Sequence, residues 1–474
     1  MIIEKKNKNK IKKYLFFSIF FYIFLGIYVL SFFEIIPVSM YGIFLILFMI
    51  NQLVMAKLNF NQNKKCLLKE QIKIYDILIV GYRENEEYWK NCLNSIKEQS
   101  IAPNKIIISI DGDDEEDVYM YDTAKEIFPD SIILLNIHKG KRNAIYEGYD
   151  TIRNISNSEF VVIVDSDTYL EKDACKFLLT CINSDEKIGC ATSNIKIFNN
   201  SSLLNKIIYA RYSYAFNIER AYLSYLNIMN CCSGPLSIYR KELITKEFLD
   251  KFNNQSCCKN KIEPGDDRHQ TLLILKEGYK SKMTSLSICY TESPNSFIRF
   301  LKQQLRWCRS FYREQYWQMK CIPNQPYYLS IIMIYEIFFP FFIIGWILYL
   351  LLINNTTFFL LLQSFIICCG IIVIRTIFLI CYTKEIKNIF NIFYLFIYIL
   401  FIIPIKIYSV FTLIINNWIT SNRKFINEMC SYDILLMFIF IMTWISILCF
   451  GTFNIIYNHF FYKHHYIYEQ NCIQ

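Results

Sequence analysis

The sequence predicts an α/β domain, built on a mainly parallel sheet, inserted between transmembrane α-helices with amphipathic interface helices. Of the 474 residues, 54% are hydrophobic and 19% are charged, which is too apolar for soluble domains alone. The apolar excess lies at the two ends of the chain, whereas the middle has an ordinary composition. Within that middle part, short apolar runs alternate with helical stretches, as in a parallel α/β sheet.

The N-terminal membrane region is predicted at residues 1–60. Residues 13–58 are almost continuously apolar except near Glu34 and Pro37, and this length suffices for two hydrophobic helices of about 20 residues each. The lysines before them should stay cytoplasmic; two crossings then return the chain, so the central domain is cytoplasmic. A cleavable signal peptide is the alternative, but the first stretch is long and lacks a small-residue cleavage site.

The central domain is predicted at residues 61–324. It begins with a buried strand at 75–81, a helical stretch at 84–99 and a second strand at 105–110 that ends in Asp111. Further strands follow at 131–135 and 160–167. Because ligands of parallel sheets bind beyond the carboxyl ends of the strands, the acids at these ends form the candidate site.

The first candidate motif is Asp165-Ser-Asp167. Two carboxylates one residue apart can hold a hard divalent cation whose other ligands are water and phosphate oxygens, which suits a nucleotide diphosphate leaving group. A solvated turn or a helix cap is the alternative for so short a motif. There is no glycine-rich phosphate loop, and this disfavours dinucleotide-binding and P-loop proteins.

The second candidate motif is Gly265-Asp-Asp-Arg-His269. An inverting sugar transfer needs a carboxylate that accepts a proton from the acceptor hydroxyl, and Asp267 is the candidate base. The alternative is an acid in the first turn of a helix at 270–277.

The third candidate is a basic helix at residues 297–314. Steps of three and four place its cations on one face, and a neighbouring tryptophan fits a helix at the membrane interface. Lipid headgroups would account for the first two cations. Gln303, Arg306 and Trp307 instead face the active site in this interpretation, Arg306 binding a diphosphate and Trp307 a sugar ring. The cations are Arg299, Lys302, Arg306, Arg309 and Arg313.

The C-terminal membrane region is predicted at residues 325–474, with spans at 328–352, 357–381 and 432–458. Residues 388–417 are also apolar, but Pro404 and Lys406 interrupt them and both flanks are basic. We therefore predict an interfacial or re-entrant segment there rather than a span.

The spacing of the cysteines and histidines does not predict a zinc site. The 18 cysteines include no C-x-x-C pair, and in a reducing compartment they serve as small buried hydrophobes more often than as disulfides. The five histidines supply no zinc set.

Taken together, seven motifs resemble those of the processive family 2 glycosyltransferases, most closely the hyaluronan synthases. Two further stretches, 216–220 and 310–314, are similar to hyaluronan synthase segments that generic glycosyltransferases lack, and 418–423 resembles the family's gating loop. In chain order the motifs are Gly81-Tyr-Arg-Glu84, Ile110-Asp-Gly112, Gly140-Lys-Arg142, Asp165-Ser-Asp-Thr168, Ser233-Gly-Pro-Leu236, Gly265-Asp-Asp-Arg-His269 and Gln303-Gln-Leu-Arg-Trp307.

This resemblance implies a GT-A type glycosyltransferase domain. In such a domain Asp165 and Asp167 would bind Mg²⁺ or Mn²⁺ as well as the nucleotide, and Asp267 would be the catalytic base. The implied substrate-binding residues are Tyr82, Glu84, Asp111, Lys141, Asp165, Asp167, Gln303, Arg306 and Trp307 for the UDP-sugar, and Ser233, Gly234, Pro235, Leu236 and Trp307 for the acceptor.

The resemblance also implies how the membrane part works. A gating loop at 416–424 would close over bound UDP, and the hydrophobic helices would form a channel for the nascent polysaccharide. The loop residues are Trp418, Thr420, Ser421 and Arg423, with Ile419 and Asn422 in place of the family's usual glycines.

The implied product is hyaluronan, made from UDP-GlcNAc and UDP-glucuronate. Residues 138–143 and 305–309 are also close to chitin and chito-oligosaccharide synthases, so a synthase that uses only UDP-GlcNAc is the alternative. A channel or scaffold that has lost activity is a third possibility, disfavoured by the retained acids. The net charge is +9, and we expect the lysines and arginines to bind UDP, the polymer and membrane lipids rather than nucleic acid. We also expect a monomer to be functional.

Overall fold

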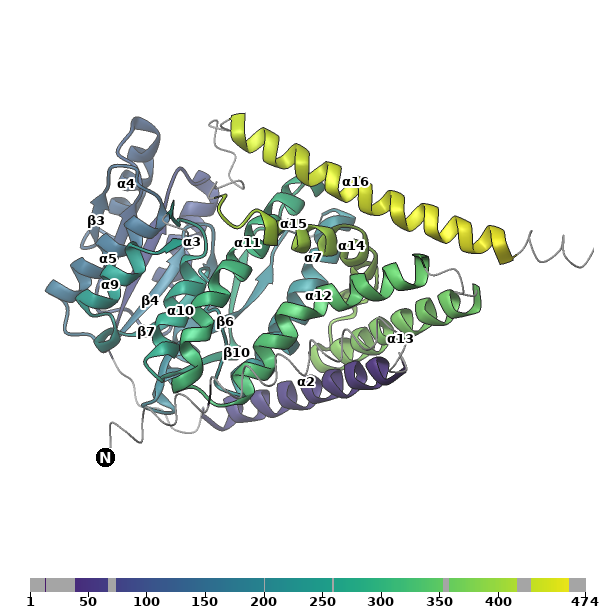
Figure 1. Ribbon diagram of the computed structural model, residues 1–474. Coiled ribbons are helices and arrows are strands. Elements are labelled where there is room, and N and C mark those ends of the chain that lie inside the picture. The colour runs from purple at the N-terminus through teal and green to yellow at the C-terminus, as the bar shows by residue number, and fades with distance from the viewer. Residues whose placement is uncertain are drawn as a thin grey trace, which may run out of the picture.

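The computed structural model describes Lys13 and residues 39–66, 74–199, 201–257, 260–352, 358–415 and 428–459. Figure 1 shows a sheet with its covering helices at one end and long helices that extend away from it at the other. Most of the first predicted hydrophobic helix and the predicted gating loop lie outside the described residues.

The sheet has eight strands in the order β3-β2-β1-β4-β7-β6-β10-β5. The pairs β3–β2, β2–β1, β1–β4 and β6–β10 are parallel, whereas β7 pairs antiparallel with β4 and β6. This confirms the mainly parallel α/β fold. The strands are β1 (Tyr75–Gly81), β2 (Ile106–Ile110), β3 (Ile132–Leu135), β4 (Phe160–Asp165), β5 (Tyr169–Leu170), β6 (Ile188–Ile197), β7 (Leu236–Arg240) and β10 (Lys280–Thr291). A separate hairpin pairs β8 (Ser256–Cys257) with β9 (Asn260–Lys261).

Amphipathic helices cover the sheet because their apolar faces pack on its buried strands. The helix α3 (Glu86–Lys97) illustrates the local logic: the Asn85 side chain caps it by accepting from the Glu87 backbone N–H at 2.9 Å, and Trp89 and Leu93 are buried. The other helices that pack around the sheet are α4 (Glu115–Ile127), α5 (Lys141–Ile155), α6 (Ala174–Asn183), α9 (Lys246–Asn253) and α10 (Asp266–Lys276).

Four helices of the described residues are long and apolar enough to cross a membrane. Three of them, α12 (Tyr328–Leu352), α13 (Phe358–Thr383) and α16 (Glu428–Tyr457), match the predicted spans. The fourth, at 386–411, is an irregular helix made of η4 (Ile386–Phe393), α14 (Tyr394–Ile397), η5 (Tyr398–Ile402) and α15 (Ile403–Phe411). Its interfacial or re-entrant placement stays a prediction.

The helix α2 (Ser39–Cys66) continues further than the apolar pattern indicates. Its polar second half is held by the α/β domain: the Ser224 hydroxyl donates to Asn59 Oδ1 at 2.9 Å, and Asn59 and Asn63 both donate to the Met283 carbonyl at 3.4 Å. These tertiary hydrogen bonds explain why the helix extends past the apolar stretch.

Four elements lie between the sheet and the long apolar helices: α7 (Leu203–Tyr214), the π-helix η1 (Ala215–Arg220), α8 (Ala221–Tyr225) and α11 (Phe297–Cys321). The basic stripe of α11 does not face a membrane surface as a whole. Both Arg309 and Arg313 are buried: Arg309 donates to Asp433 of α16, and Arg313 donates to the Leu413 carbonyl just after α15. The five cations therefore do not act as one stripe, because protein groups satisfy the guanidinium groups of Arg309 and Arg313. Headgroup binding by Arg299 and Lys302 stays a prediction.

Candidate active site

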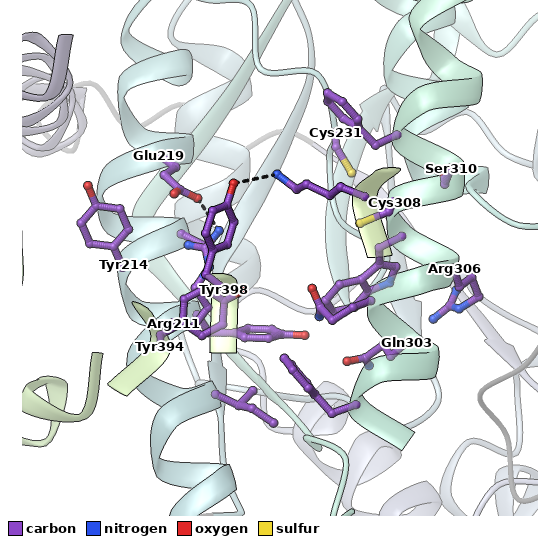
Figure 2. Close-up of a pocket in the computed structure, with 18 of the residues that line it drawn as sticks. Arg211, Tyr214, Glu219, Cys231, Gln303, Arg306, Cys308, Ser310, Tyr394 and Tyr398 are labelled. Carbon is purple, nitrogen blue, oxygen red and sulfur yellow. Dashed lines mark hydrogen bonds and ion pairs between the residues drawn. The ribbon is translucent and has the colours of Figure 1, made fainter. Parts of the chain in front are cut away.

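A single cavity of about 2460 Å³ connects the carboxyl ends of β1, β2 and β4 with the space between the long apolar helices. Every sequence-predicted site residue within the described part of the chain lines it, except Leu236. Figure 2 shows α11 contributing one side of the deep part, opposite residues from α7 and the irregular helix. The labelled residues on the α11 side are Gln303, Arg306 and Cys308. Those on the opposite side are Arg211 from α7 and Tyr394 and Tyr398 from the irregular helix.

The outer end of the cavity combines two stacked rings with a buried acid. The rings of Tyr82 and His138 stack with centroids 4.3 Å apart and an interplanar angle of 15°. Asp111 follows β2 and is buried; its Oδ1 accepts from the backbone N–H groups of Lys139 and Gly140 at 3.0 and 3.1 Å. These hydrogen bonds hold the loop that carries His138 beside Tyr82. Tyr82 and Asp111 directly follow β1 and β2, as the sequence predicts.

The carboxylates of Glu84, Asp165 and Asp167 lie close together at the next position. Lys141 Nζ lies 2.6 Å from Asp165 Oδ1, and Glu84 Oε2 accepts from the Ser166 hydroxyl at 3.0 Å. Burial, together with the nearby carboxylates of Asp165 and Glu84, raises the pKa of Asp167 to about 7. The pocket therefore holds more negative charge than Lys141 alone balances.

This excess of negative charge fits a divalent cation. Among the described residues, no group of three His, Cys, Asp or Glu side chains converges to hold a metal ion. Asp165 and Asp167 would supply two carboxylates, and water and phosphate oxygens the remaining ligands of a hard cation. The residues thus fit a metal that binds together with a nucleotide diphosphate.

We expect the substitution Asp167→Ala to weaken metal-dependent UDP binding at least about tenfold, because it removes one of two carboxylate ligands. Calorimetric titration of UDP with and without Mn²⁺ measures this effect. The exposed acid Asp130 provides a control, since Asp130→Ala should leave both titrations unchanged. An unaltered metal dependence in Asp167→Ala would remove Asp167 from the metal site.

The two acids of the second motif have different surroundings. Asp267 faces the cavity at the start of α10 (Asp266–Lys276); its Oδ1 accepts from the Arg268 N–H at 2.7 Å and its Oδ2 lies 3.3 Å from Cys231 Sγ. Asp266 is buried, with Oδ2 3.9 Å from Lys141 Nζ, and burial beside Asp267 raises its pKa. Asp267 is the more accessible of the two for a substrate proton.

The loop of residues 233–235 also lines the cavity. Arg220, the last residue of η1, donates to the Ser233 hydroxyl. Gly234 approaches Asp165 so closely that an added Cβ would lie 2.8 Å from its Oδ2. Leu236 does not line the cavity: it is buried in β7, paired with Val164.

The helix α11 brings Gln303, Arg306 and Trp307 to the same cavity. Burial lowers the pKa of the Arg306 guanidinium, and the carboxylates of Asp266 and Asp267 oppose this shift. Trp307 remains 38% exposed, so its ring is available to an apolar sugar face.

Polar residues deep in the cavity were not predicted as site residues. Arg211 Nη2 lies 2.8 Å from Glu219 Oε2, and Arg375 Nη2 lies 4.0 Å from the other oxygen. Lys406 donates to the Tyr398 hydroxyl at 3.3 Å, as the dashed line in Figure 2 marks. The available signal was the isolated charges of Arg375 and Lys406 in apolar segments, which commonly face a polar path.

Comparisons with known proteins agree with this geometry. A family model described as "Glycosyltransferase like family 2" matches residues 74–310, half of the chain. Human hyaluronan synthase 2 is 28% identical over 431 residues, covering 82% of this chain and 77% of the human protein. Human hyaluronan synthase 3 is 27% identical over 389 residues, covering 74% and 70%.

Among solved structures, the mannosyltransferase PcManGT from Pyrobaculum calidifontis, in complex with GDP-Man and Mn²⁺, is 13% identical with a TM-score of 0.44. The match covers 72% of this chain and 94% of that protein. The family assignment rests instead on the match over residues 74–310, which contains the strand-end acids, Asp267, Arg306 and Trp307. The chain belongs to glycosyltransferase family 2 and is a glycosyltransferase enzyme.

Proposed function

We propose that this protein is a membrane-embedded, processive, inverting glycosyltransferase that polymerises UDP-GlcNAc and UDP-glucuronate into hyaluronan and exports the polymer through its own helices. In this proposal residues 1–60 and 325–474 form the membrane regions. Residues 61–324 form a cytoplasmic catalytic domain, and the loop at 416–424 closes over UDP.

The observation that carries the proposal is the continuity of the cavity. Asp165 and Asp267 line it at the sheet edge, and Trp346 of α12 and Ile371 of α13 line it among the long apolar helices. An acceptor chain extended at Asp267 would thus already lie in the path between the helices. Synthesis and export of one chain could then use the same cavity.

The arrangement of the acids and bases supports a single displacement. The acceptor hydroxyl would attack C1 of the donor sugar as its bond to UDP breaks, and Asp267 would take the hydroxyl proton. Arg306 would stabilise the negative charge that develops on the diphosphate, and Trp307 would hold the acceptor ring. A divalent cation on Asp165 and Asp167, when bound, would neutralise the leaving diphosphate as a Lewis acid.

Hyaluronan is the preferred product because hyaluronan synthases match this chain over most of its length. The chitin-type alternative rested on two short segments, 138–143 and 305–309, and the relatives do not favour it. Both alternatives share the transfer chemistry and differ in the second donor.

Purified protein should incorporate radiolabel into polymer only when both UDP-GlcNAc and UDP-glucuronate are present. Hyaluronidase should degrade that polymer and chitinase should not. Polymer made from UDP-GlcNAc alone and degraded by chitinase would contradict the proposal and support the alternative.

A further inference from the structure

A buried polar network lies behind the active site and takes no part in the chemistry described above. Its centre is Glu314 on α11, two helical turns after Trp307. The Glu314 side chain is 1% exposed, and its partner His269 is completely buried. Burying a carboxylate is unfavourable unless it is hydrogen-bonded, so the folded state depends on the hydrogen bonds that Glu314 accepts.

Glu314 accepts from two donors on two other segments. Its Oε2 lies 3.1 Å from His269 Nδ1, and its Oε1 accepts from the Gln255 side-chain amide. Because a carboxylate only accepts, Nδ1 of His269 carries the proton. The imidazole ring of His269 packs perpendicular to the indole ring of Trp317, with centroids 4.8 Å apart. Glu314 therefore fixes the imidazole two residues after Asp267.

The network reaches the nucleotide end through Arg142. This buried guanidinium donates to Gln255 Oε1 at 2.8 Å and to the Phe252 carbonyl at 2.9 Å. Arg142 directly follows Lys141, whose Nζ contacts Asp165. The chain of contacts Glu314, Gln255 and Arg142 thus connects α11 with the start of α5.

Backbone packing places α10 against α11 at the same point. Gly265 precedes α10 with φ +99°, and an added Cβ would overlap the Ser310 hydroxyl and lie 4.0 Å from Glu314 Oε1. Only glycine adopts this conformation without strain and allows so close an approach. The close contact at Gly265 therefore fixes the start of α10, which carries Asp267, against α11.

We propose that Glu314 is a positioning residue for glycosyl transfer. Its carboxylate holds the helix that carries Asp267, the helix that carries Arg306 and Trp307, and, through Gln255, the segment that carries Lys141. The proposal rests on the proposed transfer reaction, and it predicts a larger loss in turnover than in nucleotide binding. Small misplacements of catalytic groups are enough to slow a reaction by about 10²-fold.

The test uses Glu314→Gln, which preserves the shape of the side chain. An amide offers one acceptor oxygen where the carboxylate offers two, so one of the two donors loses its partner. We expect kcat to fall about 10- to 100-fold. The Kd for UDP should rise by a smaller factor than kcat falls, because Tyr82 and Asp111 lie outside the network and only Lys141 and Arg306 are connected to it. Turnover is measured as UDP release with whichever UDP-sugar the wild-type protein consumes, so a different polymer would not affect the comparison.

The double variant Gln255→Glu/Glu314→Gln separates positioning from loss of folding. The amide introduced at position 314 can accept from His269 and donate to the carboxylate introduced at position 255, which can accept from Arg142. Every hydrogen bond is then restored, and we expect kcat to recover to within about threefold of wild type. The exposed Glu277→Gln on the end of α10 is the surface control.

Two results would overturn the proposal. One is an unchanged kcat in Glu314→Gln. The other is a parallel loss of kcat, UDP affinity and melting temperature in the single variant that the double variant does not reverse, which would make Glu314 a general stability residue.

Discussion

Substitution of Asp267 by Asn should abolish most glycosyl transfer while leaving UDP binding nearly intact. The amide cannot accept the hydroxyl proton, and general bases contribute about 10²- to 10⁴-fold to rates, so kcat should fall by that factor. In the wild-type structure Asp267 Oδ1 accepts from the Arg268 N–H at 2.7 Å. The oxygen of an asparagine side chain can still accept this hydrogen bond, so the start of α10 should be preserved. UDP release and calorimetric UDP titration on the same preparation measure the two effects.

The surface acid Asp250, exposed on α9, supplies the matched control, because Asp250→Asn changes the same charge far from the cavity. Turnover of Asp267→Asn close to that of the control would refute the base assignment. A large loss of UDP affinity in Asp267→Asn would instead place this acid in the nucleotide site.

The second large effect concerns stability at the junction of the catalytic and membrane parts. Arg309 on α11 binds Asp433 on α16 through both carboxylate oxygens, at 2.8 and 2.6 Å, and donates to the Thr412 hydroxyl. Both charged side chains are buried, 2% and 3% exposed. Arg309→Gln leaves the Asp433 carboxylate buried without its cation, which costs about 3–5 kcal/mol.

We therefore expect Arg309→Gln to lower the melting temperature of the detergent-solubilised protein by several degrees. Arg299→Gln, on the exposed part of the same helix, should change it little. Arg309→Lys keeps the charge but loses the two-pronged geometry, so its melting temperature should lie between these two. Adding Asp433→Asn to Arg309→Gln should recover part of the loss, whereas additive effects would argue against a direct pair.

The strand-end residues were predictable from sequence for a simple physical reason. Buried parallel strands appear as short apolar runs, and the polar residue that follows each run lies at one edge of the sheet. Asp111 directly follows β2 and Asp165 is the last residue of β4. Asp267 was predictable from its motif and from its place at the start of a helix. The three spans after Tyr328 follow from apolar length alone.

Contacts between distant segments could not be predicted in the same way. Helical periodicity places Arg309 on the cationic face of its helix but does not identify its partner Asp433, which lies 124 residues away. Glu314 was noticed within a motif, but its link to His269 depends on how α10 crosses α11. Leu236 belongs to a site motif in sequence and to the sheet core in space, because β7 begins at that residue.

A polar residue behind the base also has its partner in the fold. Gln270, on α10, is buried and accepts from the Tyr149 hydroxyl at 2.8 Å. The hydrogen bond joins α10 to α5, so a polar side chain is accommodated behind the base without an unsatisfied group.

The central claim is that one cavity serves both synthesis and export. Its most direct test is the purified protein reconstituted into sealed vesicles, with UDP-GlcNAc, UDP-glucuronate and Mg²⁺ added outside to the molecules whose catalytic domain faces outward. The account predicts polymer inside the vesicles that resists added hyaluronidase until detergent opens the membrane. Polymer that forms at the same rate but is fully degraded before detergent is added would contradict it.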